Sequence, residues 1–146
     1  MMVTRLIASA ALTLAMAGAQ AFDFKTIANG PVILYDAPSQ KGGKLFIAPR
    51  GMPVEVVLTY GEWAKVRDAT GDMAWVEQRH LSPRRNVVVR TNNARVRALA
   101  DEGATAVMSA ERGVLLELVD TQGGWVKVRH RDGITGFIRS SDIWGV

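Results

Sequence analysis

The sequence of 146 residues contains no cysteine, and this absence narrows the functional classes open to the chain. Without thiols there are no disulfides, no cysteine-ligated metal, no thiol nucleophile and no lipid attached through cysteine. The two histidines, His80 and His130, have no second histidine at metal-binding spacing. No serine has the context of an exposed nucleophile, and no glycine-rich phosphate loop occurs. The sequence therefore predicts a protein that is not an enzyme and holds no cofactor or metal.

The sequence also lacks a large excess of positive or negative charge. The formal net charge is +4, and loss of Arg5 with the N-terminal segment lowers it by one, to +3. Basic residues alternate with acidic ones, whereas a nucleic-acid-binding surface concentrates them on one face. The densest basic group is predicted to be a solvated strand face and comprises Arg84, Arg85, Arg90, Arg95 and Arg97. We expect no nucleic-acid partner, although a mild positive excess favours contact with anionic surfaces.

Long hydrophobic runs are absent except at the N-terminus. Arg5 precedes the apolar segment 6–16, and Ala19-Gln20-Ala21 follows as a small-residue cleavage site, which is the order of an export signal. A membrane anchor is the alternative, but a spanning helix needs roughly 20 apolar residues and this core is shorter and rich in alanine. We therefore expect residues 1–21 to be a cleaved signal peptide. The product should be periplasmic or extracellular, without stable membrane insertion.

The strongest positive feature is an internal repeat. Gly61-Glu62-Trp63-Ala64-Lys65-Val66-Arg67 returns, 62 positions later, as Gly123-Gly124-Trp125-Val126-Lys127-Val128-Arg129. The same offset pairs Arg112-Gly113 with Arg50-Gly51 and Gly133 with Gly71, without a gap. A repeat of this kind marks duplicated structural units. The sequence therefore predicts two tandem modules, residues 22–84 and 85–146.

Each module has the pattern of a small all-β unit. Short runs rich in branched residues, such as 53–59 and 114–119, are separated by glycine-containing turns. In 63–67 and 125–129 the residues alternate, so tryptophan, lysine and arginine share one face and Ala or Val the other. Ala98–Glu102 has helical propensity, but its repeat partner contains Pro38, which favours a loop in both copies. We expect two tandem small β-barrels, each of about five strands.

Modules of this size are marginally stable alone, because a chain of about 60 residues buries only about 60% of its unfolded surface. No disulfide compensates for the small core. The junction 81–86 is short and is not a Gly/Ser-rich flexible linker. We therefore expect the two modules to pack against each other.

These motifs resemble the bacterial SH3-like domains, the Src-homology-3 barrels of exported prokaryotic proteins. The resemblance covers nearly all of the chain after residue 21, twice, and rests on Gly-x-Trp-x-Lys-Val-Arg, then Gly, then an aromatic residue followed by Val or Ile. Leu34-Tyr35-Asp36-Ala37 is similar to the motif that opens the eukaryotic relatives. The family's members are associated with cell-wall peptides, with hydrolases that they target, or with protein partners.

The resemblance implies a peptide groove lined by Tyr35 and Trp63. In the second module the equivalent residues are Arg97 and Trp125. The proline and tyrosine that complete a polyproline groove in the family are replaced by Glu77 and His80, and by Arg139 and Asp142 in the repeat. Because recognition of proline-rich helices needs an aromatic-lined trough, a polyproline ligand is not expected.

A structural role for the tryptophans is the alternative, since Trp63 and Trp125 can cover a core edge or pack between the modules. Packing is favoured for Trp125, and both readings stay open for Trp63. Trp75 and Phe137, next to Val76 and Ile138, are predicted to be structural.

Two functional hypotheses follow. The first is an exported module that binds cell-wall peptides or an envelope protein in a cleft beside Tyr35, Trp63 and the loop 36–44. Asp36 begins this loop, Lys41 and Lys44 add cationic contacts, and Lys65 shares the Trp63 face. The second is a structural component of an envelope assembly without a small ligand. Binding of anionic polymers is a third, weaker possibility, and the oligomeric state stays open.

Overall fold

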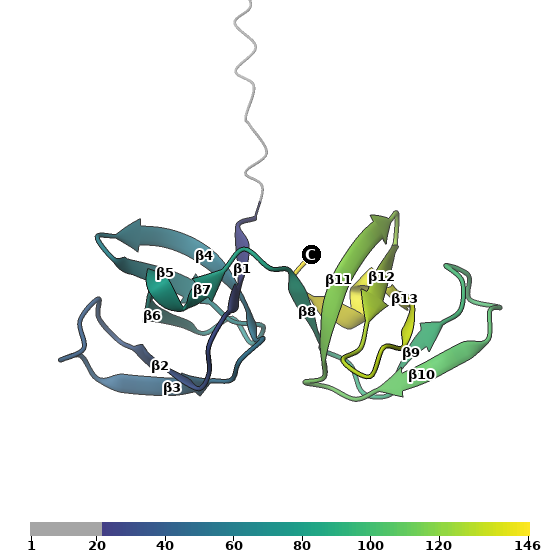
Figure 1. Ribbon diagram of the computed structural model, residues 1–146, viewed down its shortest axis with the longest axis horizontal. Coiled ribbons are helices and arrows are strands. Elements are labelled where there is room, and N and C mark those ends of the chain that lie inside the picture. Colours follow the sequence, from purple (N-terminus) through teal and green to yellow (C-terminus); the bar gives the residue numbers. More distant parts are fainter. Residues whose placement is uncertain (1–21) are drawn as a thin grey trace, which may run out of the picture.

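The computed structural model describes residues 22–146, and the predicted export signal, residues 1–21, lies outside the described residues. Two antiparallel β-sheets of seven strands each make up this part of the chain, with two short 3-10 turns and no α-helix among residues 22–146. The sheets lie side by side, joined by a short connection between β7 and β8 (Figure 1). The all-β class is therefore confirmed.

The first sheet contains the strands from residue 24 to residue 82. Its spatial order is β3-β2-β6-β5-β4-β1-β7, and all neighbouring strands are antiparallel. The 3-10 turn η1 connects β6 to β7. In chain order its elements are β1 Phe24–Ile27, β2 Val32–Tyr35, β3 Lys44–Ala48, β4 Pro53–Tyr60, β5 Trp63–Arg67, β6 Met73–Glu77, η1 Gln78–His80 and β7 Leu81–Ser82.

The second sheet repeats the first element by element. Its order is β10-β9-β13-β12-β11-β8-β14, the same topology with the numbering raised by seven. Every element begins and ends 62 residues after its counterpart, which confirms the repeat register. In chain order the elements are β8 Asn86–Val89, β9 Ala94–Arg97, β10 Ala106–Ala110, β11 Leu115–Gln122, β12 Trp125–Arg129, β13 Thr135–Arg139, η2 Ser140–Asp142 and β14 Ile143–Trp144.

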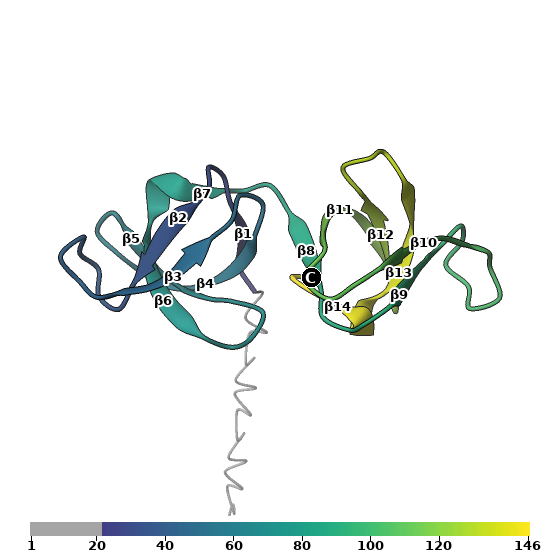
Figure 2. The same ribbon diagram turned by 90° about the horizontal axis from the view of Figure 1, so that it is seen from below.

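Each sheet curves around a hydrophobic core of its own (Figure 2). The predicted alternation in β5 and β12 holds, because Ala64, Val66, Val126 and Val128 are buried while the residues between them are not. The remaining buried residues come mainly from equivalent positions of the two sheets: Ile27, Val32, Leu34, Ala48, Val54, Ala74 and Val76 in the first, Val87, Val89, Ala94, Val96, Ala110, Leu116, Ile138 and Ile143 in the second.

The connections have the turn chemistry that the sequence predicts. In the β5–β6 turn, one carboxylate oxygen of Asp68 accepts hydrogen bonds from the backbone N–H groups of Thr70 and Asp72, at 2.9 and 3.1 Å. Gly71 at the same turn has φ +92° and its repeat partner Gly133 has φ +90°, a region that favours glycine. Residues 98–102 form bends and a turn, which confirms the expected loop.

Among residues 22–146, the paired strands end at β3 and β7 in the first sheet and at β10 and β14 in the second, and no pairing joins the two edge strands of either sheet. Closure into a barrel therefore stays a prediction, as do the boundaries at 21/22 and 84/85. No helix within residues 22–146 has the length and hydrophobicity that crossing a membrane requires.

A small set of contacts, here called the seam, joins the two sheets. The Phe24 ring packs edge-on against the Trp144 ring, with centroids 5.1 Å apart at 84°. The guanidinium of Arg85 lies 5.3 Å from the Phe24 ring centroid, and its Nη2 atom donates a hydrogen bond to the Gly145 carbonyl oxygen at 2.8 Å. Asn86 Nδ2 donates to the Gly51 carbonyl oxygen at 2.9 Å. These contacts support the expectation that the halves pack together.

The seam corrects one prediction from the sequence. Arg85 is not part of a solvated strand face, because its side chain is half-buried and its Nε atom is buried without a hydrogen-bond partner among the described residues. A guanidinium tolerates this position because its Nη2 group donates to Gly145 and its flat face lies over Phe24. The tryptophan that packs between the sheets is Trp144, not Trp63 or Trp125.

Replacing Phe24 tests whether the seam stabilises the whole chain. Phe24→Ala removes the edge-on aromatic contact and the cation–π contact, so we expect a loss of about 2 kcal/mol in the free energy of unfolding. We also expect calorimetric unfolding to broaden or split as the two sheets uncouple. Tyr60→Ala is the matched control, because Tyr60 is an aromatic residue with 68% exposure outside the seam. An unchanged midpoint and a single sharp transition for Phe24→Ala would show that the seam contributes nothing.

Candidate functional site

The outward side of the first sheet carries a group of aromatic residues. The Tyr35 and Trp63 rings meet edge to face, with centroids 5.7 Å apart and an interplanar angle of 84°. In the strand register Trp75 lies opposite both Tyr35 and Lys65. Directly opposed residues of antiparallel strands point to the same side. We call Tyr35, Trp63, Lys65 and Trp75 the aromatic face.

Trp75, which the sequence predicts to be structural, lies on the aromatic face. Its neighbours Ala74 and Val76 are buried in the core, whereas Trp75 is half-buried and points to the opposite side of β6. Phe137 has the equivalent outward position in β13, opposite Lys127 and Arg97. The tryptophan that the sequence assigned to structure therefore stands beside the predicted binding residues.

The loop 36–43 next to the aromatic face is held in shape by Asp36. Its Oδ1 atom accepts a hydrogen bond from the Gly43 N–H at 2.7 Å. A Cβ atom at Gly43 would lie 2.7 Å from the other carboxylate oxygen, so the close approach requires glycine. Asp36 thus shapes the loop, with its carboxylate turned toward the loop backbone. Lys41 and Lys44 are exposed on the loop and at the start of β3.

Glu77 ties the far end of the same loop to the sheet. Its carboxylate accepts hydrogen bonds from Gln40 Nε2 and from Arg79 Nε, each at 2.7 Å. The Arg79 hydrogen bond, then the Gln40 hydrogen bond, hold the pKa of Glu77 below its ordinary value. In β6, Glu77 lies opposite Trp63 of β5, so this tether stands at one end of the aromatic face.

The second sheet places different chemistry at equivalent positions. Arg139, in the place of Glu77, forms an ion pair with Glu102, in the place of Gln40. The Arg139 guanidinium also lies 5.1 Å from the Trp125 ring centroid. The loop tether is therefore kept in both copies, with a charged pair replacing the Gln–Glu hydrogen bond. Arg97 stands where the first sheet has Tyr35, and its Nη1 donates to the Ala104 carbonyl oxygen at 2.9 Å.

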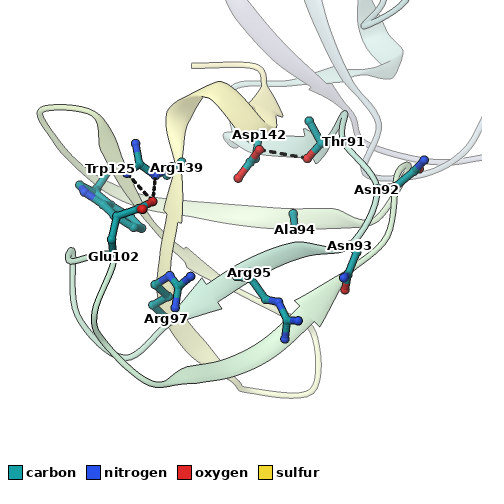
Figure 3. Close-up of a pocket in the computed structure, with 10 residues that line it drawn as sticks. All are labelled: Thr91, Asn92, Asn93, Ala94, Arg95, Arg97, Glu102, Trp125, Arg139 and Asp142. Atoms are coloured by element: carbon teal, nitrogen blue, oxygen red, sulfur yellow. Dashed lines mark hydrogen bonds and ion pairs between the residues drawn. The ribbon is translucent and has the colours of Figure 1, made fainter.

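A pocket of about 180 Å³, here called the second-sheet pocket, opens at this place. Figure 3 shows Trp125, Arg139 and Glu102 grouped on one side of it, Arg95 and Arg97 along another, and Asp142 bonded to Thr91 at a third. The lining residues are Thr91, Asn92, Asn93, Ala94, Arg95, Arg97, Glu102, Trp125, Arg139 and Asp142.

The predicted site residues thus fall into two groups, one on each sheet. Tyr35, Trp63 and Lys65 gather on the aromatic face, and Arg97 and Trp125 line the second-sheet pocket. Residues that the sequence analysis did not assign to a site complete these groups: Trp75, Glu77 and Gln40 in the first, and Arg95, Glu102, Arg139 and Asp142 in the second. The 62-residue offset relates part of the second group to the first: Arg97, Glu102, Trp125 and Arg139 stand at the positions of Tyr35, Gln40, Trp63 and Glu77.

Metal coordination is not indicated by the geometry. No cluster of three or more His, Cys, Asp or Glu side chains suited to a metal ion occurs in the part of the chain from residue 22 onward. The two groups offer aromatic contact on the first sheet, and guanidinium contact beside an indole on the second.

Comparison with known proteins gives one family. The family model described as Bacterial SH3 domain matches twice, over residues 28–83 and 90–145. No curated protein matches the sequence.

Among solved structures, the fold is similar to that of NlpC1 from Trichomonas vaginalis, with TM-score 0.38 and 14% identity over 90% of this chain. It is similar to NlpC2 from the same organism, with TM-score 0.38 and 12% identity over 88% of this chain. It is also similar to an NlpC/P60 family protein from Bacillus cereus ATCC 10987, with TM-score 0.38 and 15% identity over 83% of this chain. The chain spans 49%, 49% and 55% of those three proteins.

The Glu77 tether gives a pH-dependent prediction. Because folding lowers the pKa of Glu77, the tether contributes fully above the ordinary carboxyl value of 4.5 and is lost as pH falls through the lower folded value. The side-chain amide of Gln40, observed by NMR, should therefore titrate with a midpoint below 4.5. Arg79→Gln should raise this midpoint, since it removes the largest cause of the shift.

Two controls accompany this titration. Glu77→Gln should abolish it, and Arg50→Gln, which removes an exposed cation elsewhere, should leave it unchanged. A Gln40 midpoint at or above 4.5 in the unmodified protein would contradict the tether.

Proposed function

Because the chain belongs to the bacterial SH3 domain family, with one copy in each half, we propose that it is a non-catalytic binding module of the cell envelope. Its ligands are peptide portions of the cell wall, bound at the aromatic face. We infer further that residues 1–21 are a cleaved export signal and that the product acts in the periplasm or outside the cell. Each half, 22–84 and 85–146, then closes as an SH3-like barrel.

The observation that carries the proposal is the edge-to-face contact between Tyr35 and Trp63 on the outward side of the sheet. Both residues are half-buried, so each presents part of its ring to solvent from a rigid strand end. Aromatic side chains fixed in this way supply contact area to a peptide at a small cost in conformational entropy. The inward residues Ala64 and Val66 already fill the core, so Trp63 is not required there.

Polar groups border the aromatic face on two sides. Lys65 shares the face, and Lys41 and Lys44 are exposed on the neighbouring loop, where they suit carboxylates of a ligand. Glu77 lies beside Trp63, and its carboxylate is held by Gln40 and Arg79. A short peptide with an apolar middle and a carboxylate fits this arrangement, because the rings supply apolar contact and the lysines supply charge-assisted contacts.

A protein partner is the second candidate, and a separate feature favours it. The edge strand β3 exposes three apolar residues in a row, Leu45, Phe46 and Ile47, at 46%, 38% and 72%. The equivalent strand β10 has Val107, Met108 and Ser109 there, and only Val107, at 42%, is an exposed large hydrophobic residue, so the apolar edge is larger on the first sheet. Unpaired edges of this kind accept a strand from another chain.

Co-sedimentation of the purified protein with peptidoglycan tests the proposal. The unmodified protein should pellet with the wall material, and Trp63→Ala should raise the apparent Kd about tenfold or more, because a central aromatic contact is lost. Leu99→Ala, which removes an apolar residue with 65% exposure from the loop of the second half, should bind normally.

Stability measurements separate binding from folding in this experiment. Trp63→Ala should lose much less than the about 3–5 kcal/mol that removal of a core tryptophan costs. If the protein does not co-sediment at low salt, and Leu45→Ser abolishes capture of an envelope protein, the binding surface is the β3 edge and not the aromatic face. A loss of 3 kcal/mol or more in Trp63→Ala, on the scale of core substitutions, would mean that Trp63 is a packing residue.

A further inference from the structure

Two arginines of β9 carry positive charge into the second-sheet pocket without a carboxylate partner. Arg95 and Arg97 are two positions apart in a strand, so both point to the same side of the sheet. Arg97 Nη1 donates to the Ala104 carbonyl oxygen at 2.9 Å, and Arg95 Nη1 to Ser109 Oγ at 3.3 Å. Neither forms an ion pair within residues 22–146. Neutral acceptors therefore fix both guanidiniums and leave their charges uncompensated.

The acidic residues of the pocket do not neutralise this pair. Glu102 forms its ion pair with Arg139, which also covers the Trp125 ring. Asp142 accepts a hydrogen bond from the Thr91 hydroxyl at 3.1 Å, on a different side of the pocket from Arg97 (Figure 3). Since Asp142 repels an anion, a bound anion is directed toward the opposite end, where Arg95 and Arg97 stand.

The first sheet has no such charge at equivalent positions. Ile33 and Tyr35 occupy the places of Arg95 and Arg97, and Glu77 occupies the place of Arg139. The two halves share topology, core positions and loop tether, so these differences lie in the surface and not in the fold. The two copies therefore offer different ligand chemistry from the same place in the same architecture.

We propose that the second-sheet pocket is a carboxylate-binding site, distinct from the aromatic face, and that it takes the C-terminal carboxylate of a short peptide. Arg97 and Arg95 hold the carboxylate, and the exposed part of the Trp125 indole contacts the residue before it. A guanidinium suits this role because its planar N–H groups match the two oxygens of a carboxylate. Arg97 is half-buried, which reduces solvent screening of the contact.

This inference extends the proposed function, because it names the ligand chemistry of the second copy, and it does not require the aromatic face to bind. The Trp63→Ala variant should therefore keep the carboxylate site intact. Loss of binding at the aromatic face and loss of binding at the second-sheet pocket are thereby separate outcomes.

An NMR titration of the purified protein tests the site, with the Trp125 indole N–H as reporter. The probes are N-acetyl-alanyl-alanine with a free carboxylate, the same dipeptide as its C-terminal amide, and glucuronate as an acidic sugar. The free acid should shift the Trp125 resonance saturably, and the amide should bind at least about tenfold more weakly, as loss of a charge-assisted contact implies. Added salt should weaken binding of the acid.

Variants assign the contact to the two arginines. Arg97→Gln and Arg95→Gln should each weaken binding of the acid about tenfold. Arg112→Gln is the matched control, because it removes one exposed positive charge from the same half, outside the pocket. Arg95 is exposed, so Arg95→Gln keeps the test valid if Arg97→Gln destabilises the fold.

The outcomes are distinct. Tighter binding of glucuronate than of the dipeptide acid, with the same dependence on Arg95 and Arg97, keeps the carboxylate site and overturns its assignment to a peptide in favour of an acidic sugar. Equal affinity for the acid and the amide, equal weakening by Arg112→Gln, or no saturable shift of Trp125 overturns the proposal.

Discussion

The strict alternation of β5 and its copy β12 is the constraint on which the rest of the structure depends. Ala64 and Val66 point into the first core, while Trp63 and Lys65 point outward. A shift of one residue in strand pairing would bury the tryptophan and the lysine and expose the core residues, so the hydrophobic core fixes the register. The same alternation places the candidate binding residues on the outside. Core and site are thus two faces of the same strands.

Duplication with divergence at the surface explains how one small architecture carries two chemistries. The buried positions remain apolar in both copies, because each small sheet has little apolar surface to lose. The outward positions are free of that requirement, and they differ between the copies. Arg97 stands at the position of Tyr35, and Arg139 at the position of Glu77. The tether between loop and sheet survived this change with new partners. The seam around Phe24, Arg85 and Trp144 joins the two small cores.

The sequence predicted what depends on local pattern and on the repeat. Strand positions, the alternation of β5, the turn at Gly71 and the 62-residue register all follow from spacing and residue type, and the structure agrees with them. The pairing of Tyr35 with Trp63 came from the family resemblance, and the structure places the two rings in contact.

Features that depend on contacts between distant segments were not predictable in this way. Trp75 was predicted to be structural because it adjoins Val76, but its position beside Tyr35 and Lys65 depends on the pairing of β6 with β2 and β5. Arg85 looked like a surface cation until packing of the two sheets set it against Phe24. Gln40 and Glu77 are 37 positions apart, and only the folded loop brings them together. Composition carries no information on such neighbours.

The most direct test follows the four tryptophan indole resonances while soluble peptide fragments released from peptidoglycan are added to the protein. If the outward side of the first sheet is the binding surface, Trp63 and Trp75 shift saturably and Trp144, packed in the seam, does not move. Shifts of Trp144 without shifts of Trp63, or no shift of any indole, would contradict the account.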